Sequence, residues 1–289
     1  MTRVGILLIR LLRFLPLRAL GELGWVLGYI LALLARERRH VVWVNLGLCF
    51  PHLSDVARRR LLLQHFQAFA RSVLERGIVW WGSVRDIQKL VSIEGIEHWR
   101  ALQGRPVIWL APHFVGLDMG GIRLASEFPV VSVYSQQKNR YFNDFLLTRR
   151  TRFAHVQLVS RQQGLRPIIQ AVKSGVALYY LPDQDFGARD ALFVPFFGVP
   201  AATVTGLARL AALTGATILP AVTRQLPKGR GYLLKIYEPW ENYPSGDLEK
   251  DTLRMNAFIE ERVREMPEQY NWLHKRFKTR PTKSPGFYL

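Results

Sequence analysis

The feature that most constrains the fold is an alternation of short apolar runs with longer amphipathic stretches through the middle of the chain. Four apolar runs are bounded by proline, glycine or polar residues and predict buried strands at 107–111, 130–134, 176–181 and 216–222. The intervening stretches have helical periodicity, at 116–127, 139–153, 165–174 and 203–214. Strands that alternate with helices favour an α/β fold with a mostly parallel sheet flanked by helices.

Two longer helices are predicted outside this region. The first runs from Ser54, a suitable N-cap, to Gly82, with large apolar residues at helical spacing. The second covers about Leu248 to Met266 and precedes a basic tail. Because no linker or repeat divides the chain after residue 35, we expect residues 36–289 to form one globular domain.

The N-terminus is almost entirely apolar from Val4 to Ala35. Its cleanest part, Leu23–Ala35, is shorter than the ~20 residues of a spanning helix, but extension back to Phe14 adds only two charges, Arg18 and Glu22. Residues 1–35 are therefore predicted to be a retained, hydrophobic membrane-anchoring helix that either spans the bilayer or lies flat on it. A buried core helix is the alternative.

The charge of the chain indicates polyanionic partners. Forty Lys and Arg residues against 22 Asp and Glu give a net charge of +18, which attracts nucleic acid, anionic lipid or acidic protein. Arg36, Arg38 and Arg39 follow the apolar segment and suit an anionic cytoplasmic leaflet. A non-enzymatic basic protein that binds membranes or nucleic acid is one alternative. The dispersed charge and the lack of a nucleic-acid-binding motif disfavour nucleic acid as a partner.

A histidine and an aspartate follow the first predicted strand, where ligands collect in open α/β sheets. His113 and Asp118 would lie about 140° apart on one straight helix, so they can meet only across a bend, which Pro112 and Gly116 permit. A carboxylate-bound histidine can act as a general base. No serine or cysteine lies beside the pair, so the nucleophile would be the substrate's own hydroxyl. A hydrogen-bonded core histidine is the alternative.

Several sequence blocks resemble one enzyme family. His113 to Gly121 is similar to the His-x4-Asp/Glu motif of the glycerolipid and lysophospholipid acyltransferases, and within them most resembles the late acyltransferases of lipid A biosynthesis, which add lauroyl or myristoyl chains. The resemblance extends to further blocks at 45–51, 138–139, 183–189, 193–198 and 267–281. Together these blocks cover most of the chain from about Arg36 onward.

The resemblance implies roles for particular residues. His113 would be the general base and Asp118 the carboxylate that orients it. The remaining candidates would bind the acceptor: Arg149, Arg166, Asp183, Gln184, Asp185 and Arg189. Two alternatives concern the same block, because an Asp183-x-Asp185 pair also suits the metal site of a glycosyltransferase, and Arg189 could form an internal salt bridge.

The resemblance also implies the substrates and the location. The donor would be a fatty acyl group on acyl carrier protein, and the acceptor a phosphorylated glycolipid, the lipid A precursor. No metal or organic cofactor and no nucleic acid would be required. The enzyme would bind the inner membrane, with its catalytic domain facing the cytoplasm. Another acceptor, such as a lysophospholipid, glycerol 3-phosphate or an amino-acid lipid, is the alternative within the same enzyme class.

Overall fold

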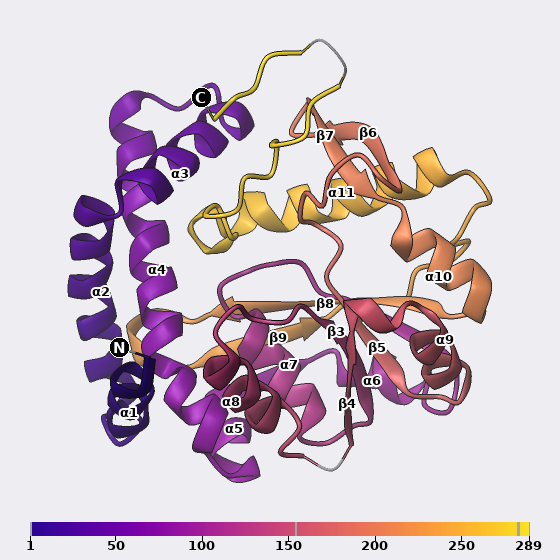
Figure 1. Ribbon diagram of the computed structural model, residues 1–289, viewed down its shortest axis with the longest axis horizontal. Coiled ribbons are helices and arrows are strands. Elements are labelled where there is room, and N and C mark those ends of the chain that lie inside the picture. Colours follow the sequence, from indigo (N-terminus) through magenta and orange to yellow (C-terminus); the bar gives the residue numbers. More distant parts are fainter. Residues whose placement is uncertain (1, 154, 282–283, 289) are drawn as a thin grey trace.

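A seven-stranded sheet forms the centre of the computed structural model, which describes residues 2–153, 155–281 and 284–288 (Figure 1). The strand order is β1-β9-β8-β2-β5-β3-β4, and every neighbouring pair is parallel except β8 and β9. The strands are β1 (Val91–Glu94), β2 (Val107–Leu110), β3 (Val130–Tyr134), β4 (Val156–Ser160), β5 (Ala177–Tyr180), β8 (Thr217–Gln225) and β9 (Tyr232–Ile236). The mostly parallel α/β sheet expected from the sequence is confirmed.

Helices cover both faces of this sheet (Figure 1). They are α5 (Val84–Leu90), α6 (Ile96–Arg100), α7 (Leu117–Ala125), α8 (Arg140–Arg150), α9 (Arg166–Lys173), α10 (Gly206–Thr214) and α11 (Leu248–Glu265). Strand β2 shows the reason for this arrangement, because it is buried along its whole length. Its Ile108 and Leu110 pack with α9, α10 and α11, while Val107 and Trp109 pack with α5, α6 and α7. A continuous apolar run therefore marks a strand with helices on both sides.

Four helices precede the sheet: α1 (Thr2–Leu12), α2 (Leu17–Leu34), α3 (Arg36–Cys49) and α4 (Asp55–Trp81). The α4 prediction is confirmed, since the Ser54 side chain accepts a hydrogen bond from the Ala57 amide and the helix ends at Gly82. Helix α4 contacts α2 on one side and α7 on the other. Among the described helices, only α2 is long and apolar enough to cross a membrane, by length and composition alone.

Part of one predicted helix is strand. The segment 203–214 was expected to be helical throughout, but Thr203 and Val204 end strand β7 (Val199–Val204), which forms an antiparallel hairpin with β6 (Ala191–Phe196). The helix α10 begins only at Gly206. The cause is tertiary, because Thr203 is fully buried and its hydroxyl accepts a hydrogen bond from Arg276 in the C-terminal segment.

Candidate active site

The carboxyl ends of two neighbouring strands bring a histidine and an aspartate together. Strands β2 and β5 are parallel neighbours, and Leu110 pairs with Tyr180 at the ends of the two strands. His113 and Asp183 each follow those residues by three positions (110 to 113, 180 to 183). Because the register is matched, the two loops leave the sheet side by side, and their side chains meet.

His113 is held by two hydrogen bonds to the carboxylate of Asp183. Its backbone amide donates to Oδ2 at 2.9 Å, and Nδ1 lies 2.6 Å from Oδ1. Burial raises the pKa of Asp183, but the charge of His113 and its hydrogen bonds outweigh this effect and hold that pKa below its ordinary value. A carboxylate only accepts hydrogen bonds, so Nδ1 carries a proton. The His113 side chain is 15% exposed, and no hydrogen bond joins its Nε2 to another residue that the structure describes.

Asp118 lies elsewhere in the same site. It stands in the first turn of α7 and forms ion pairs with Arg76 at 3.0 Å and Arg150 at 3.6 Å. Burial raises the pKa of Asp118, but Arg76, Arg150 and His113 together hold it below its ordinary value. Within the described part of the chain, no hydrogen bond joins Asp118 to His113. The prediction that Asp118 contacts the imidazole is therefore wrong. Asp183 makes this contact, and two arginines hold Asp118.

The C-terminal segment braces the histidine loop. The Asn271 amide donates to the His113 carbonyl at 2.8 Å, and the Val115 amide donates to the Gln269 carbonyl at 2.8 Å. Tyr270 lies between these two contacts, and its hydroxyl reaches the Asp183 carbonyl at 3.5 Å. The aromatic block at 267–281 thus fixes both loops of the site, a function that its composition alone does not reveal.

The two aspartates of the Asp183-x-Asp185 pair have different partners. Asp185 accepts hydrogen bonds from the Thr279 amide at 2.6 Å and the Thr279 hydroxyl at 2.7 Å, whereas Asp183 faces His113. Among the described residues, no group of three or more His, Cys, Asp or Glu side chains is arranged to hold a metal ion. The divergent partners do not suit a shared metal, so the carboxylates do not support the glycosyltransferase alternative.

Burial keeps two histidines of this region neutral. It lowers the pKa of His274, whose Nε2 accepts a hydrogen bond from the Asp185 amide, to about 4. It also lowers the pKa of His65, which is hydrogen-bonded to the Glu268 carbonyl, to about 4. Both imidazoles have an ordinary pKa of 6.5, so they bind protons more weakly in the folded protein than in the unfolded chain.

We expect these histidines to make the protein less stable in acid. Between the ordinary pKa of 6.5 and about 4, the unfolded chain binds more protons, so the free energy of unfolding should fall as the pH is lowered through this window. Melting temperatures measured in detergent from about pH 7 to about pH 5 would test this. His274→Gln keeps a hydrogen-bond acceptor without a titrating group, so its melting temperature should depend less on pH. An unchanged pH dependence in that variant would contradict the assignment.

The other predicted binding residues are dispersed. Arg149 stands in the last turn of α8, with its guanidinium over the Trp81 ring at 5.4 Å and the Phe145 ring at 5.5 Å. Its Nε, and Nε and Nη2 of nearby Arg152, are buried without hydrogen-bond partners among the described residues. Gln184 is half-buried, whereas Arg166 and Arg189 are exposed and form no ion pair in the described part of the chain. The structure thus brings Asp183 to His113, and places neither Arg166 nor Arg189 in contact with them.

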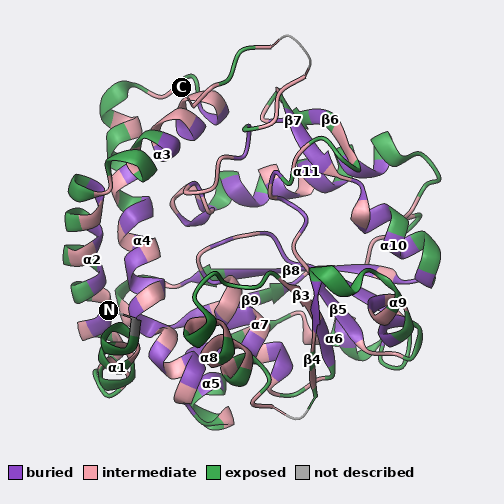
Figure 2. Cartoon of the chain, in the orientation of Figure 1, coloured by how far each residue is buried: buried purple, intermediate pink, exposed green. Residues whose placement is uncertain are grey.

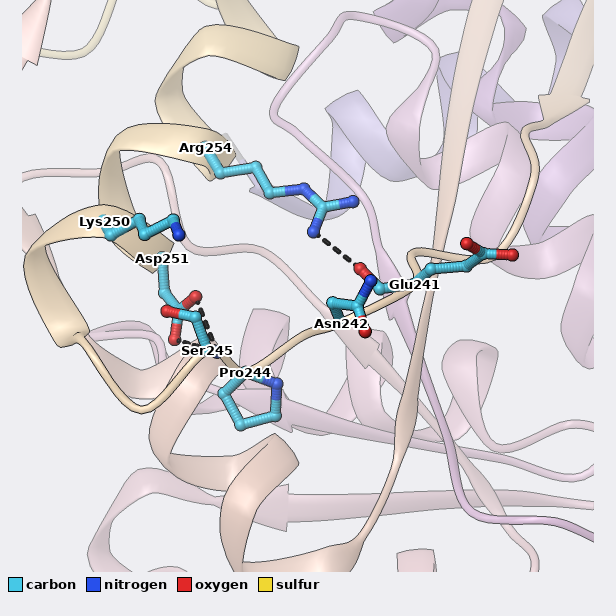
Figure 3. Close-up of a pocket in the computed structure, with 7 residues that line it drawn as sticks. All are labelled: Glu241, Asn242, Pro244, Ser245, Lys250, Asp251 and Arg254. Carbon is cyan, nitrogen blue, oxygen red and sulfur yellow. Dashed lines mark hydrogen bonds between the residues drawn. The ribbon is translucent and has the colours of Figure 1, made fainter.

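A cavity of about 840 Å³ lies apart from this site (Figure 3). It is bounded by the segment before α11 and by the first turns of that helix. Some of its polar groups pair with one another, since Arg254 donates to the Glu241 carbonyl and the Ser245 amide donates to both oxygens of Asp251. None of its lining residues is among those predicted to act on a substrate.

Comparison with known proteins identifies the family. Residues 1–279 match the model of the bacterial lipid A biosynthesis acyltransferases. The lipid A biosynthesis lauroyltransferase of Escherichia coli K12 is 34% identical over all of this chain and 94% of its own length, and the palmitoleoyltransferase of the same strain is 31% identical over 95% and 90%. A 1-acyl-sn-glycerophosphate acyltransferase structure from Thermotoga maritima aligns with 85% of this chain and 97% of its own at 19% identity and a TM-score of 0.42. The chain therefore belongs to the bacterial lipid A biosynthesis acyltransferase family.

Proposed function

We propose that the protein transfers a fatty acyl group from acyl carrier protein to a hydroxyl of a lipid A precursor, with His113 as the general base. The observation that carries this proposal is the hydrogen bond from His113 Nδ1 to the buried Asp183 carboxylate. It fixes the tautomer in which Nε2 has a free lone pair. Such a nitrogen can accept a proton from a hydroxyl near neutral pH.

The chemical steps follow from this arrangement. As Nε2 removes its proton, the acceptor hydroxyl oxygen attacks the thioester carbonyl of the donor. A carbon–oxygen bond forms and the carbon–sulfur bond breaks, and the proton on Nε2 passes to the departing thiolate. Asp183 stabilises the imidazolium in between, as a buried carboxylate hydrogen-bonded to a catalytic histidine does.

Arginines near the site would bind the acceptor phosphate. The buried guanidinium nitrogens of Arg149 and Arg152 lack partners within the described residues, and a phosphate oxygen is the acceptor that arginine binds best. Exposed Arg166 and Arg189 supply further positive charge, and Gln184 lies next to Asp183. In this proposal Asp183 and Asp185 act through the loop that they hold, since protein donors already occupy both carboxylates.

The excess of positive charge supports an acidic acyl carrier protein as donor. A net charge of +18 attracts a polyanionic carrier and speeds its encounter with the enzyme. Salt at ~0.1 M screens charges beyond about 10 Å. Attraction to the carrier should therefore weaken as the salt concentration rises. The same charge favours an inner-membrane location, with the catalytic domain on the side where the carrier is found.

The function can be tested with the purified full chain and a lipid A precursor that lacks a secondary acyl chain. With acylated carrier protein, mass spectrometry should show a product heavier by one acyl group, and the rate at low donor concentration should fall as salt is added. Two results would overturn the proposal: acylation of glycerol 3-phosphate or a lysophospholipid but not of the precursor, or a salt-independent preference for acyl-coenzyme A.

Charge reversal refines this test. Arg59→Glu/Arg60→Glu and Lys275→Glu/Lys278→Glu should raise the KM for the acylated carrier severalfold with a smaller change in kcat, because peripheral charges govern encounter. Arg58 is left intact because its guanidinium stacks over Trp43 at 4.4 Å. Arg85→Glu/Lys89→Glu on α5 is a matched control, since both side chains are exposed.

A further inference from the structure

Helix α2 is packed against α4 through direct backbone contact. A Cβ placed on Gly24 would lie 2.7 Å from Arg71 Cα, and one placed on Gly28 would lie 2.3 Å from Gln67 Cα. Both distances are too short for any side chain, so only glycine permits this approach. Leu20 and Ala32 extend the same buried stripe. The two helices thus form one rigid unit along most of the length of α2.

The opposite side of α2 is exposed (Figure 2), and apart from Arg18 and Glu22 its exposed side chains are apolar. Trp25 is 59% exposed and Leu34 is 75% exposed, and Val26, Tyr29, Ile30 and Leu33 lie between them. Isolated exposed apolar residues are common on soluble proteins, whereas a contiguous apolar face marks a protein or membrane contact. We call this surface, together with that of α1, the α1–α2 apolar face.

Helix α1 continues this face. Its Val4, Leu7, Leu8 and Leu11 are each more than half exposed. The helix is fixed to the end of α4, because a Cβ on Gly77 would lie 2.3 Å from the Ile9 carbonyl oxygen. Its 11 residues extend about 16 Å, which is too short to cross a hydrocarbon core of about 30 Å.

The packing on α4 also argues against a spanning α2. Because α4 runs alongside α2, a spanning α2 would carry α4 to the same depth. By the contacts of Gly24 with Arg71 and Gly28 with Gln67, exposed Gln64 and the Arg71–Glu75 ion pair of α4 lie level with α2 and would then enter the hydrocarbon, where polar side chains are costly. If α2 lies flat, these residues stay above the hydrocarbon and only the apolar face is immersed.

The positive charge around the α1–α2 apolar face is complementary to a surface of anionic lipid. Exposed arginines outnumber the exposed acidic residues Glu22 and Glu37 along the two helices: Arg3 and Arg10 in α1, Arg18 at the start of α2, and Arg36 and Arg38 just after its end. An apolar stripe with aromatic residues and flanking arginines is typical of helices that lie in the membrane interface. A second copy of the chain would bring two such arginine borders together, so anionic lipid is the better occupant.

We propose that α1 and α2 lie in the plane of a single leaflet, as a monotopic platform that neither helix crosses. The proposal extends the proposed function by stating how the enzyme meets its lipid acceptor. Helix α4 rests on the platform and also carries Arg76, which forms the ion pair with Asp118 at 3.0 Å. The site therefore lies about one helix diameter, ~10 Å, from the platform, and an acceptor could keep its acyl chains in the leaflet.

Depth measurements would test the platform. The variants Trp25→Cys and Leu33→Cys would each be spin-labelled in vesicles of phosphatidylethanolamine and phosphatidylglycerol. The two positions are eight residues apart, so the labels would differ in depth by about 12 Å if α2 spanned the bilayer. We expect both labels to lie below the surface at the same depth. Natural Cys49 is buried and should not react, and Arg85→Cys serves as the aqueous control.

Three outcomes would overturn the platform: a difference near 12 Å between the two labels, full access of both labels to a water-soluble quencher, or a stable dimer that shields them without lipid. A membrane-impermeant maleimide provides an independent check, since Pro16→Cys and Glu37→Cys should react from the same side of the vesicle. Acyl transfer is assayed separately with the unlabelled chain, so failure of the platform and failure of the proposed function remain distinguishable.

Discussion

Replacing His113 with alanine should lower the turnover of acyl transfer by on the order of 10²–10⁴-fold, the usual contribution of a general base. The loss should fall mainly on kcat, because the imidazole acts on the proton of the attacking hydroxyl rather than on the lipid as a whole. Mass spectrometry would measure the rate of product formation at saturating concentrations of acylated carrier protein and precursor.

A second substitution separates chemistry from folding. His113→Ala deprives the buried Asp183 carboxylate of one of its donors, and this loss can itself reduce stability. His113→Asn places an amide nitrogen near the position of Nδ1, so it can retain that hydrogen bond while lacking Nε2. We expect it to be folded and inactive, whereas His155→Ala, which changes an exposed histidine, should leave the rate unchanged. Wild-type turnover in either His113 variant would show that the histidine is not the base.

The regular elements of the body were largely predictable because local signals determine them. The run Val107–Leu110 is apolar throughout and bounded by proline, so it reads as a strand buried on both faces, which the structure confirms. Helix α4 has both a capping serine and a terminal glycine, and its predicted bounds are confirmed. Each of these elements is specified by residues within its own span.

The arrangement of the site depends on contacts that no local signal contains. Asp183 lies 70 positions from His113, and the two meet only because β5 is inserted beside β2 in the strand order. Their position after predicted strands was visible in the sequence, but the order of the strands was not. For the same reason, Asp118 was expected to contact the imidazole because it is near in sequence, whereas the structure places it between Arg76 and Arg150.

Asp183 and Asp118 contact different partners, so a substitution of Asp183 should produce a second large effect on turnover. Asp183→Asn preserves shape but allows the amide NH₂ to point at His113 Nδ1, which would favour the tautomer whose proton sits on Nε2. The base would then be blocked, and kcat should fall on the order of 10²–10⁴-fold, as in hydrolytic triads with the same change. The readout is kcat and KM for the precursor, with KM expected to change much less.

Asp118→Asn is the matched comparison, because it makes the same chemical change five residues from His113 in the same loop and helix. It removes the charge that neutralises Arg76 and Arg150 but leaves the Asp183–His113 hydrogen bond in place. We therefore expect a smaller loss of kcat than in Asp183→Asn, accompanied by a change in KM as the two freed arginines alter how the anionic acceptor binds. A larger loss of kcat in Asp118→Asn than in Asp183→Asn would mean that the carboxylates exchange roles when substrate binds. In that case Asp118, not Asp183, would orient the imidazole in the working enzyme.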